Sequence, residues 1–118
     1  MPKVYGIANC DTVKRARSWL AAQGLEARFH DFKKAGVPEA RLDAWLHDAG
    51  WEALLNRNGT TWRKLDDAQK AAVKNTASAR ALMLAQPSVI KRPVVEWPDG
   101  RLTVGFDAER WAAVRSGR

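Results

Sequence analysis

The chain has 118 residues, of which 46% are hydrophobic and 28% are charged, and it contains one cysteine; we expect one folded cytoplasmic domain without an internal disulfide. No N-terminal stretch resembles a secretory signal, and no apolar run reaches the roughly 20 residues of a membrane span, so we expect no membrane partner. The formal net charge of +7 comes from basic residues in runs of at most two, which argues against a nucleic-acid partner. A solvated basic surface accounts for these residues, and the alternative is a field that attracts small anions or an acidic protein surface.

The N-terminal part has the pattern of a βαβ unit. Residues 4–8 form a short apolar run with β-branched and aromatic members, which predicts a buried strand. Residues 11–23 place apolar side chains at helical spacing, and Gly24 follows as a C-terminal stop. Residues 26–32 alternate as a second strand. Because the three elements follow one another within about thirty residues, we expect the two strands to be parallel.

The middle of the chain is predicted to be helical. One helix begins near Pro38 and ends at Gly50. The pair Asn58-Gly59 is a clear turn signal. Residues 66–86 are rich in alanine and predict a helix in two pieces, with the break near Asn75.

The C-terminal part predicts a β-hairpin followed by a helix. Residues 88–97 and 101–106 have the pattern of strands, and Asp99-Gly100 between them is a good hairpin turn. Asp107 is a plausible N-cap for a last helix over residues 107–118. The order β-α-β, helical middle, β-β-α predicts an α/β fold with one mixed sheet and helices packed on it.

Cys10 stands where the first predicted strand meets the first predicted helix. Free N–H groups and the helix dipole at such a position favour an anion, so they lower the pKa of a thiol and make it nucleophilic. The neighbouring Asp11 opposes this effect, while Thr12 and the basic residues from Lys14 onward partly offset Asp11. These residues alone leave two readings open, a reactive thiol and an inert buried one.

Arg92 and Pro93 form a second candidate feature. A proline cannot donate a ladder hydrogen bond, so Pro93 either starts a strand or turns the chain through a cis bond beside a site. Arg92 would offer an oxyanion or a carboxylate two parallel hydrogen bonds. The alternative is an edge-strand proline beside a solvated arginine. His30 and His47 have no partners at ligand spacing, so we expect no metal site.

Five stretches of the sequence occur in a characteristic order: YGIANCDTVKRARSWL, FHDF, GWEALLNRNGTTWRKL, LMLAQPSVIKRPVV and VGF. In this order and spacing, over residues 3–112, the chain resembles the arsenate reductase (ArsC)/Spx family, and specifically its YffB-like branch. The resemblance implies one thioredoxin-like domain over residues 1–118, with a core of about 1–35 and 87–118 and a helical insertion of about 36–86.

The resemblance also implies roles for individual residues. Cys10 matches the nucleophilic cysteine, whose thiolate in the arsenate reductases attacks the oxyanion before glutathione attacks the adduct. Arg92 matches the arginine that precedes the family's cis-proline. The other matched positions are that proline, a further active-site arginine and the loop around the cysteine: Pro93, Arg57, Asn9, Asp11 and Thr12.

The sequence departs from the family pattern at two positions. The arsenate reductases carry a further arginine where this chain has Phe106. Loss of one charge-assisted contact of about 1.5–3 kcal/mol predicts weakened arsenate turnover. The redox-sensing regulators of the family use a C-x-x-C pair, and Val13 stands at its fourth position, which excludes an internal disulfide switch.

Three functions follow as hypotheses. The first is a glutathione-dependent monothiol reductase of the arsenate reductase-like type, without a bound cofactor. Its partners would be glutathione as co-substrate and a small oxyanion, a disulfide or a protein thiol, because a single thiol needs an external one to complete exchange. The alternatives are an Spx-like regulator that binds RNA polymerase and a thioredoxin-like domain without catalysis. A depressed thiol pKa would distinguish the enzyme from the inert domain.

Overall fold

The computed structural model describes residues 1–115, and the chain divides into two compact units. The first unit contains residues 1–32 and the segment from Arg92 onward, and the second contains Lys33–Lys91. The elements of the first unit are β1 (Lys3–Gly6), α1 (Asp11–Ala22), β2 (Arg28–Asp31), β3 (Val94–Glu96), β4 (Leu102–Val104) and α8 (Ala108–Arg115). This is the predicted β-α-β…β-β-α order.

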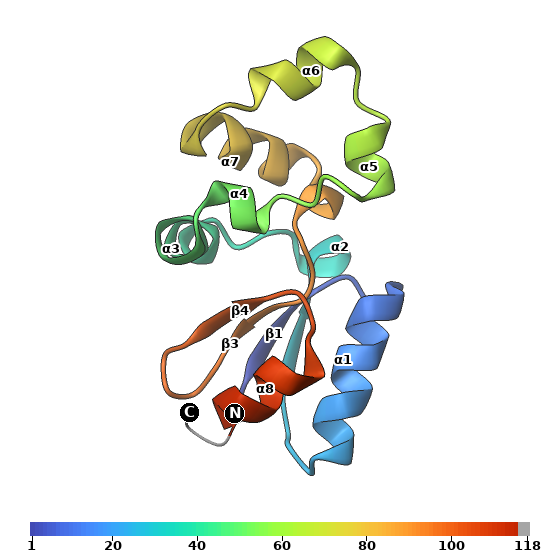
Figure 1. Cartoon of the computed structure of the whole chain (residues 1–118), viewed down its shortest axis with the longest axis vertical. Coiled ribbons are helices and arrows are strands. Elements are labelled where there is room, and N and C mark those ends of the chain that lie inside the picture. Colours follow the sequence, from blue (N-terminus) through green and yellow to red (C-terminus); the bar gives the residue numbers. More distant parts are fainter. Residues whose placement is uncertain (116–118) are drawn as a thin grey trace. The chain divides into compact units, whose positions relative to one another are not determined.

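The strands of the first unit form one mixed sheet in the order β2-β1-β3-β4 (Figure 1). Strands β1 and β2 are parallel, which confirms the predicted βαβ unit, and the pairs β1–β3 and β3–β4 are antiparallel. In the register of β1 and β3, Tyr5 lies opposite Val94. This pairing brings the chain that precedes β3 to the end of β1 where α1 begins.

One face of this sheet packs against two helices. Its cluster contains Val4 of β1, Val95 of β3, Leu20 of α1 and Trp111 of α8. The rings of Phe106 and Trp111 meet edge to face with centroids 4.8 Å apart. The shared cluster packs α1 against the sheet. The N-terminus of α1, at Asp11, follows the end of β1 at Gly6 after a short loop.

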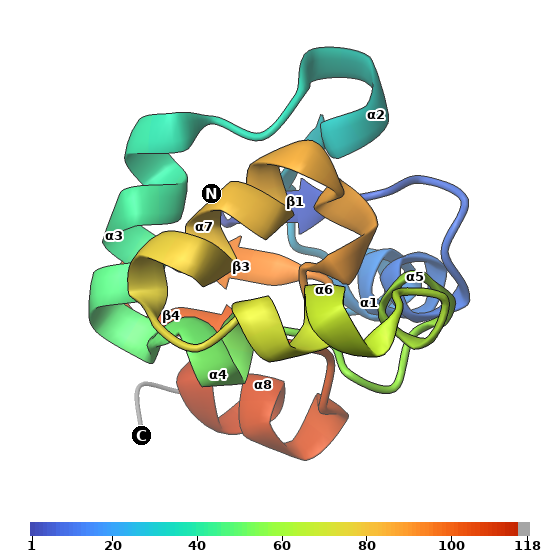
Figure 2. The ribbon, with the colours of Figure 1, turned by 90° about the horizontal axis from the view of Figure 1, so that it is seen from above.

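The second unit is helical. Its elements are α3 (Glu39–Ala49), α4 (Trp51–Leu54), α5 (Thr60–Arg63), α6 (Asp67–Ala72), α7 (Thr76–Ala85) and the 3₁₀ helix η1 (Pro87–Val89). The short helix α2 (Phe32–Ala35) spans the boundary between the units. Helix α3 packs against α4 and α7, and η1 contacts α5 and α7. Figure 2 shows α3 next to α4 and α7.

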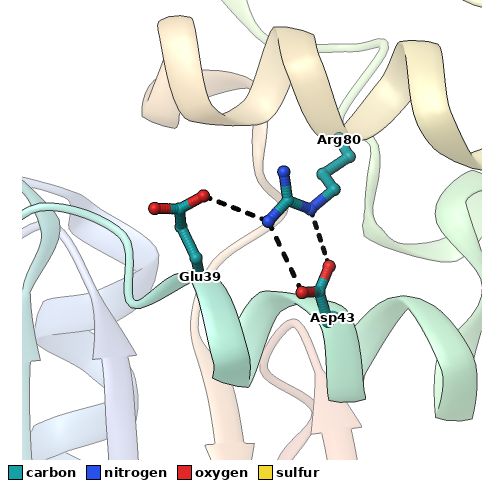
Figure 3. Close-up of polar contacts among 3 residues, drawn as sticks. All are labelled: Glu39, Asp43 and Arg80. Carbon is teal, nitrogen blue, oxygen red and sulfur yellow. Dashed lines mark hydrogen bonds and ion pairs between the residues drawn. The ribbon is translucent and has the colours of Figure 1, made fainter.

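Polar contacts define the helix ends and one helix pair of this unit. The side chain of Asn75 accepts a hydrogen bond of 2.9 Å from the Ser78 N–H and caps α7, which confirms the predicted break between α6 and α7. Arg80 of α7 forms ion pairs with two carboxylates of α3, at 2.6 Å to Asp43 and 3.1 Å to Glu39 (Figure 3). These exposed pairs join two helices that already pack against one another, and we expect them to add little to stability.

The structure corrects the predicted strand over residues 88–97. Residues 87–89 form the 3₁₀ helix η1, and the strand is limited to Val94–Glu96. The Ile90 N–H donates to the Pro87 carbonyl, and Pro93 has no N–H to add to a ladder. The apolar run therefore contains a turn that its composition does not reveal.

Other element boundaries differ by smaller amounts. The first strand ends at Gly6 rather than residue 8, and Pro38 is the N-cap of α3 rather than its first helical residue. Asp107 caps α8 as predicted, because its carboxylate accepts from the Glu109 and Arg110 N–H groups. The last helix is described from Ala108 to Arg115, and the predicted continuation over 116–118 lies outside the described residues.

Candidate active site

Cys10 is the N-cap residue of α1, as the sequence pattern predicts. Its backbone is extended (φ −141°, ψ 123°), and its carbonyl accepts a 2.9 Å hydrogen bond from the Lys14 N–H. The side chain is half-buried. Its sulfur makes no regular capping hydrogen bond, although the Thr12 and Val13 N–H groups of the first turn favour its ionised form.

The surroundings of the sulfur favour its ionised form. Burial raises the pKa of Cys10, but the Val13 N–H, the Arg92 guanidinium and the Thr12 N–H together lower it by more, so the pKa of the thiol lies below its ordinary value. Arg92 acts both as a hydrogen-bond donor and through its charge. A thiolate held in this way is the reactive form of cysteine.

Arg92 reaches the sulfur because of the strand that follows it. The Arg92-Pro93 peptide bond is cis, and Pro93 is buried, with its carbonyl accepting a 2.9 Å hydrogen bond from the Gly105 N–H. Strand β3 is a central strand of the sheet. The alternative of an edge-strand proline beside a solvated arginine is therefore wrong, and Arg92 lies next to the Cys10 sulfur.

The other predicted residues of the cysteine loop also lie in the first unit. Asn9 is exposed, and its Oδ1 accepts a 3.5 Å hydrogen bond from the Lys14 Nζ. Asp11 is the exposed first residue of α1. Thr12 is half-buried and contributes its N–H to the sulfur. Of these three residues, Thr12 has a direct effect on the thiolate.

Arg57 belongs to the second unit, between α4 and α5. Its side chain is exposed, and its guanidinium carbon lies 5.6 Å from the ring centroid of Trp51. This distance suits a cation–π contact. The role of Arg57 as an anion ligand stays a prediction.

Gly6 is a residue of the site that sequence reasoning missed. A Cβ atom built on Gly6 would lie 2.9 Å from Cγ2 of Val13 and 3.8 Å from Cβ of Arg92. Val13 and Arg92 are also two of the residues that supply donors to the Cys10 sulfur. In the sequence this glycine is one small residue in an apolar strand, with nothing to mark it.

Two further properties concern residues 1–115 as a whole. Within this range no three His, Cys, Asp or Glu residues form a group that could hold a metal ion. None of the helices described there has the length and apolar character needed to cross a bilayer.

A model of the ArsC family matches residues 5–114. The chain belongs to the ArsC family. It is similar to a YFFB protein of known structure, with 50% identity and a TM-score of 0.88 over 96% of this chain and 97% of that one. It is also similar to an arsenate reductase (ArsC) related protein from Brucella melitensis, with 52% identity and a TM-score of 0.75 over 95% and 92% of the two chains.

An uncharacterized protein of Haemophilus influenzae is 38% identical over 113 residues, which are 96% of this chain and 97% of that protein. Each of these matches extends over almost the whole length of this chain and of the matched protein. Membership of the ArsC family therefore applies to residues of both units, and it agrees with the resemblance in the sequence.

Proposed function

We propose that this ArsC-family protein is a thiol-dependent oxidoreductase that uses Cys10 as a single nucleophilic thiol and glutathione as its reducing co-substrate. The observation that carries the proposal is the position of the Cys10 sulfur at the N-terminus of α1, next to the Arg92 guanidinium. Family membership and similarity to an arsenate reductase related protein support the same reaction class.

The reaction has two exchange steps. In the first, the Cys10 thiolate attacks the glutathione sulfur of a mixed disulfide, forms a Cys10–glutathione disulfide and releases the other half as a thiolate. In the second, the thiolate of free glutathione attacks the glutathione sulfur on Cys10, forms glutathione disulfide and regenerates the Cys10 thiolate. In sum, the substrate disulfide is reduced, glutathione is oxidised, and one proton passes from glutathione to the released thiol.

The charges around the sulfur favour a disulfide substrate over arsenate. A thiolate–disulfide exchange carries one negative charge, for which the helix N–H groups and Arg92 are suited. Phe106 packs its ring against Trp111 at the position where arsenate reductases carry a further arginine. We therefore expect arsenate to be the poorer substrate.

The first test is alkylation of the single cysteine by iodoacetamide across a pH series, with Cys10→Ser as the blank. We expect a midpoint below the ordinary thiol value of about 8.5. The protein is then incubated with oxidised glutathione and weighed by mass spectrometry. We expect one glutathione on the wild type and none on the variant, and full removal of the adduct by reduced glutathione.

A second assay follows turnover with a mixed disulfide of glutathione and a small thiol, with arsenate in parallel. Formation of glutathione disulfide that depends on Cys10 supports the proposal. A thiol that stays unreactive up to about pH 9 contradicts it, and Cys10 is then a packed residue in a non-catalytic thioredoxin-like domain. Faster turnover of arsenate than of the disulfide would overturn the substrate assignment.

A further inference from the structure

We propose that Gly6 is a positioning residue of the site, whose missing side chain lets the first turn of α1 and Arg92 close together on the Cys10 sulfur. This inference rests on the proposed function only in taking Cys10 as the reacting group. A side chain added at Gly6 would meet Val13 and Arg92. Gly6 acts through these two neighbours.

The geometry at Gly6 concerns space and not backbone conformation. Gly6 is buried at the end of β1, and it is not among the described glycines with positive φ, so alanine can adopt its backbone conformation. A Cβ at this position, however, would lie 2.9 Å from Cγ2 of Val13. Ordinary carbon–carbon contact begins near 3.5 Å, so about 0.6 Å of movement is needed.

Val13 cannot absorb this movement with its side chain alone. It is 0% exposed, and a valine in a helix is restricted to one strongly preferred χ1 rotamer. The first turn of α1 must therefore move away from β1. This turn carries the Thr12 and Val13 N–H groups that stabilise negative charge on the sulfur.

Arg92 is the second neighbour of the added Cβ atom. Its Cβ would lie 3.8 Å from the added atom, which is ordinary contact, so Arg92 keeps its place while α1 moves. A methyl group on Gly6 thus separates the helical donors from the guanidinium that acts on the same sulfur. Since hydrogen bonds weaken steeply with distance and angle, the thiolate loses part of its stabilisation.

The test is Gly6→Ala, measured by the thiolate ultraviolet absorbance of Cys10 across a pH series, as a difference against the Cys10→Ser background. At a pH below the wild-type midpoint we expect the thiolate fraction to fall by about two- to tenfold, the range that partial loss of ordinary hydrogen bonds gives. A folding defect without a shift of the thiol midpoint does not fit the proposal.

The matched control is Gly24→Ala at the other end of α1. Gly24 has φ +71°, and an added Cβ there meets nothing within 4 Å. This variant strains the backbone and lowers stability, but we expect an unchanged thiol midpoint. An equal shift in both variants would overturn the proposal, because it would trace the effect to general destabilisation.

The compensating variant is Gly6→Ala combined with Val13→Ala, which keeps the Val13 N–H and removes the methyl group that the new Cβ would strike. We expect the shift caused by Gly6→Ala to be much smaller in the Val13→Ala background than in the wild type. An equal shift in both backgrounds overturns the proposal. A low pH midpoint for Cys10 ionisation in the wild type that Gly6→Ala leaves unchanged would refute this inference, while the proposed function would stand. An unreactive thiol in the wild type would instead refute the proposed function.

Discussion

Replacement of Arg92 by methionine tests the central contact of the site. The guanidinium donates a hydrogen bond to the Cys10 sulfur and also acts through its charge. Methionine keeps a long unbranched side chain to fill the space but has neither donor nor charge. We expect the pKa of Cys10 to rise toward its ordinary value, because burial of the sulfur then opposes ionisation with less compensation.

The size of the effect follows from the contact that is lost. A hydrogen bond to a charged group contributes about 1.5–3 kcal/mol, and since both side chains are only half-buried, solvent screening favours the lower end of this range. About 1.4 kcal/mol corresponds to tenfold less thiolate below the wild-type midpoint. A thiolate of higher pKa is more nucleophilic, with a Brønsted coefficient of about 0.4–0.5, so the alkylation rate there falls only about threefold.

Alkylation by iodoacetamide over a full pH series separates the two effects. Below the wild-type midpoint Arg92→Met should react more slowly than the wild type, while at high pH, where both thiols are ionised, it should react faster. The matched control is Arg17→Met, which removes the same charge from an exposed arginine of α1 whose guanidinium lies 4.2 Å from the Phe29 ring centroid. Superimposable profiles for wild type and Arg92→Met, or the same shift in Arg17→Met, would refute the reasoning.

Two further predictions concern stability. The folded protein stabilises the Cys10 thiolate more than the unfolded chain does, because the pKa of Cys10 is lowered on folding. The free energy of unfolding of the wild type, measured relative to Cys10→Ser, should therefore rise with pH; the gain is complete above about 8.5 and is lost as the pH falls through the lower folded-state pKa. Urea unfolding at a series of pH values measures this difference, and a difference that does not change with pH contradicts the prediction. Thr103→Val removes the acceptor of the 3.0 Å hydrogen bond from the buried Trp97 Nε1, which should cost about 1–3 kcal/mol in the same assay, and a neutral substitution would show that the indole finds another acceptor.

Local signals explain which parts of the fold could be predicted from the sequence. The parallel βαβ unit follows from one strand period, one helix period and the short distance between them. The hairpin turn at Asp99-Gly100 and the caps at Asn75 and Asp107 need only the side chain and the few residues next to it. The prediction that a strand begins at Ser88 was wrong, because apolar composition does not distinguish a short turn from an extended strand.

The assembly of the site could not be predicted from periodicity. Cys10 and Arg92 meet because Tyr5 pairs with Val94 across β1 and β3, and nothing in either strand alone sets that register. The family resemblance supplied the pairing of the cysteine with the arginine. It did not supply Gly6, whose proposed role depends on the distance from its position to a methyl group of Val13, and that distance is set by how β1 and α1 pack in the folded chain.

The degree of burial at Cys10 is itself part of the chemistry. A fully buried sulfur would lose more hydration than the Val13 N–H, the Thr12 N–H and Arg92 replace, and the pKa of the thiol would rise. A fully exposed sulfur would leave those donors to water and gain little from them. The half-buried position between the helix N-terminus and Arg92 stabilises one negative charge, and we expect a second thiol to attack from the exposed side of the sulfur. A monothiol mechanism needs both, since the Cys10 thiolate must first form and its mixed disulfide must then be reached by glutathione.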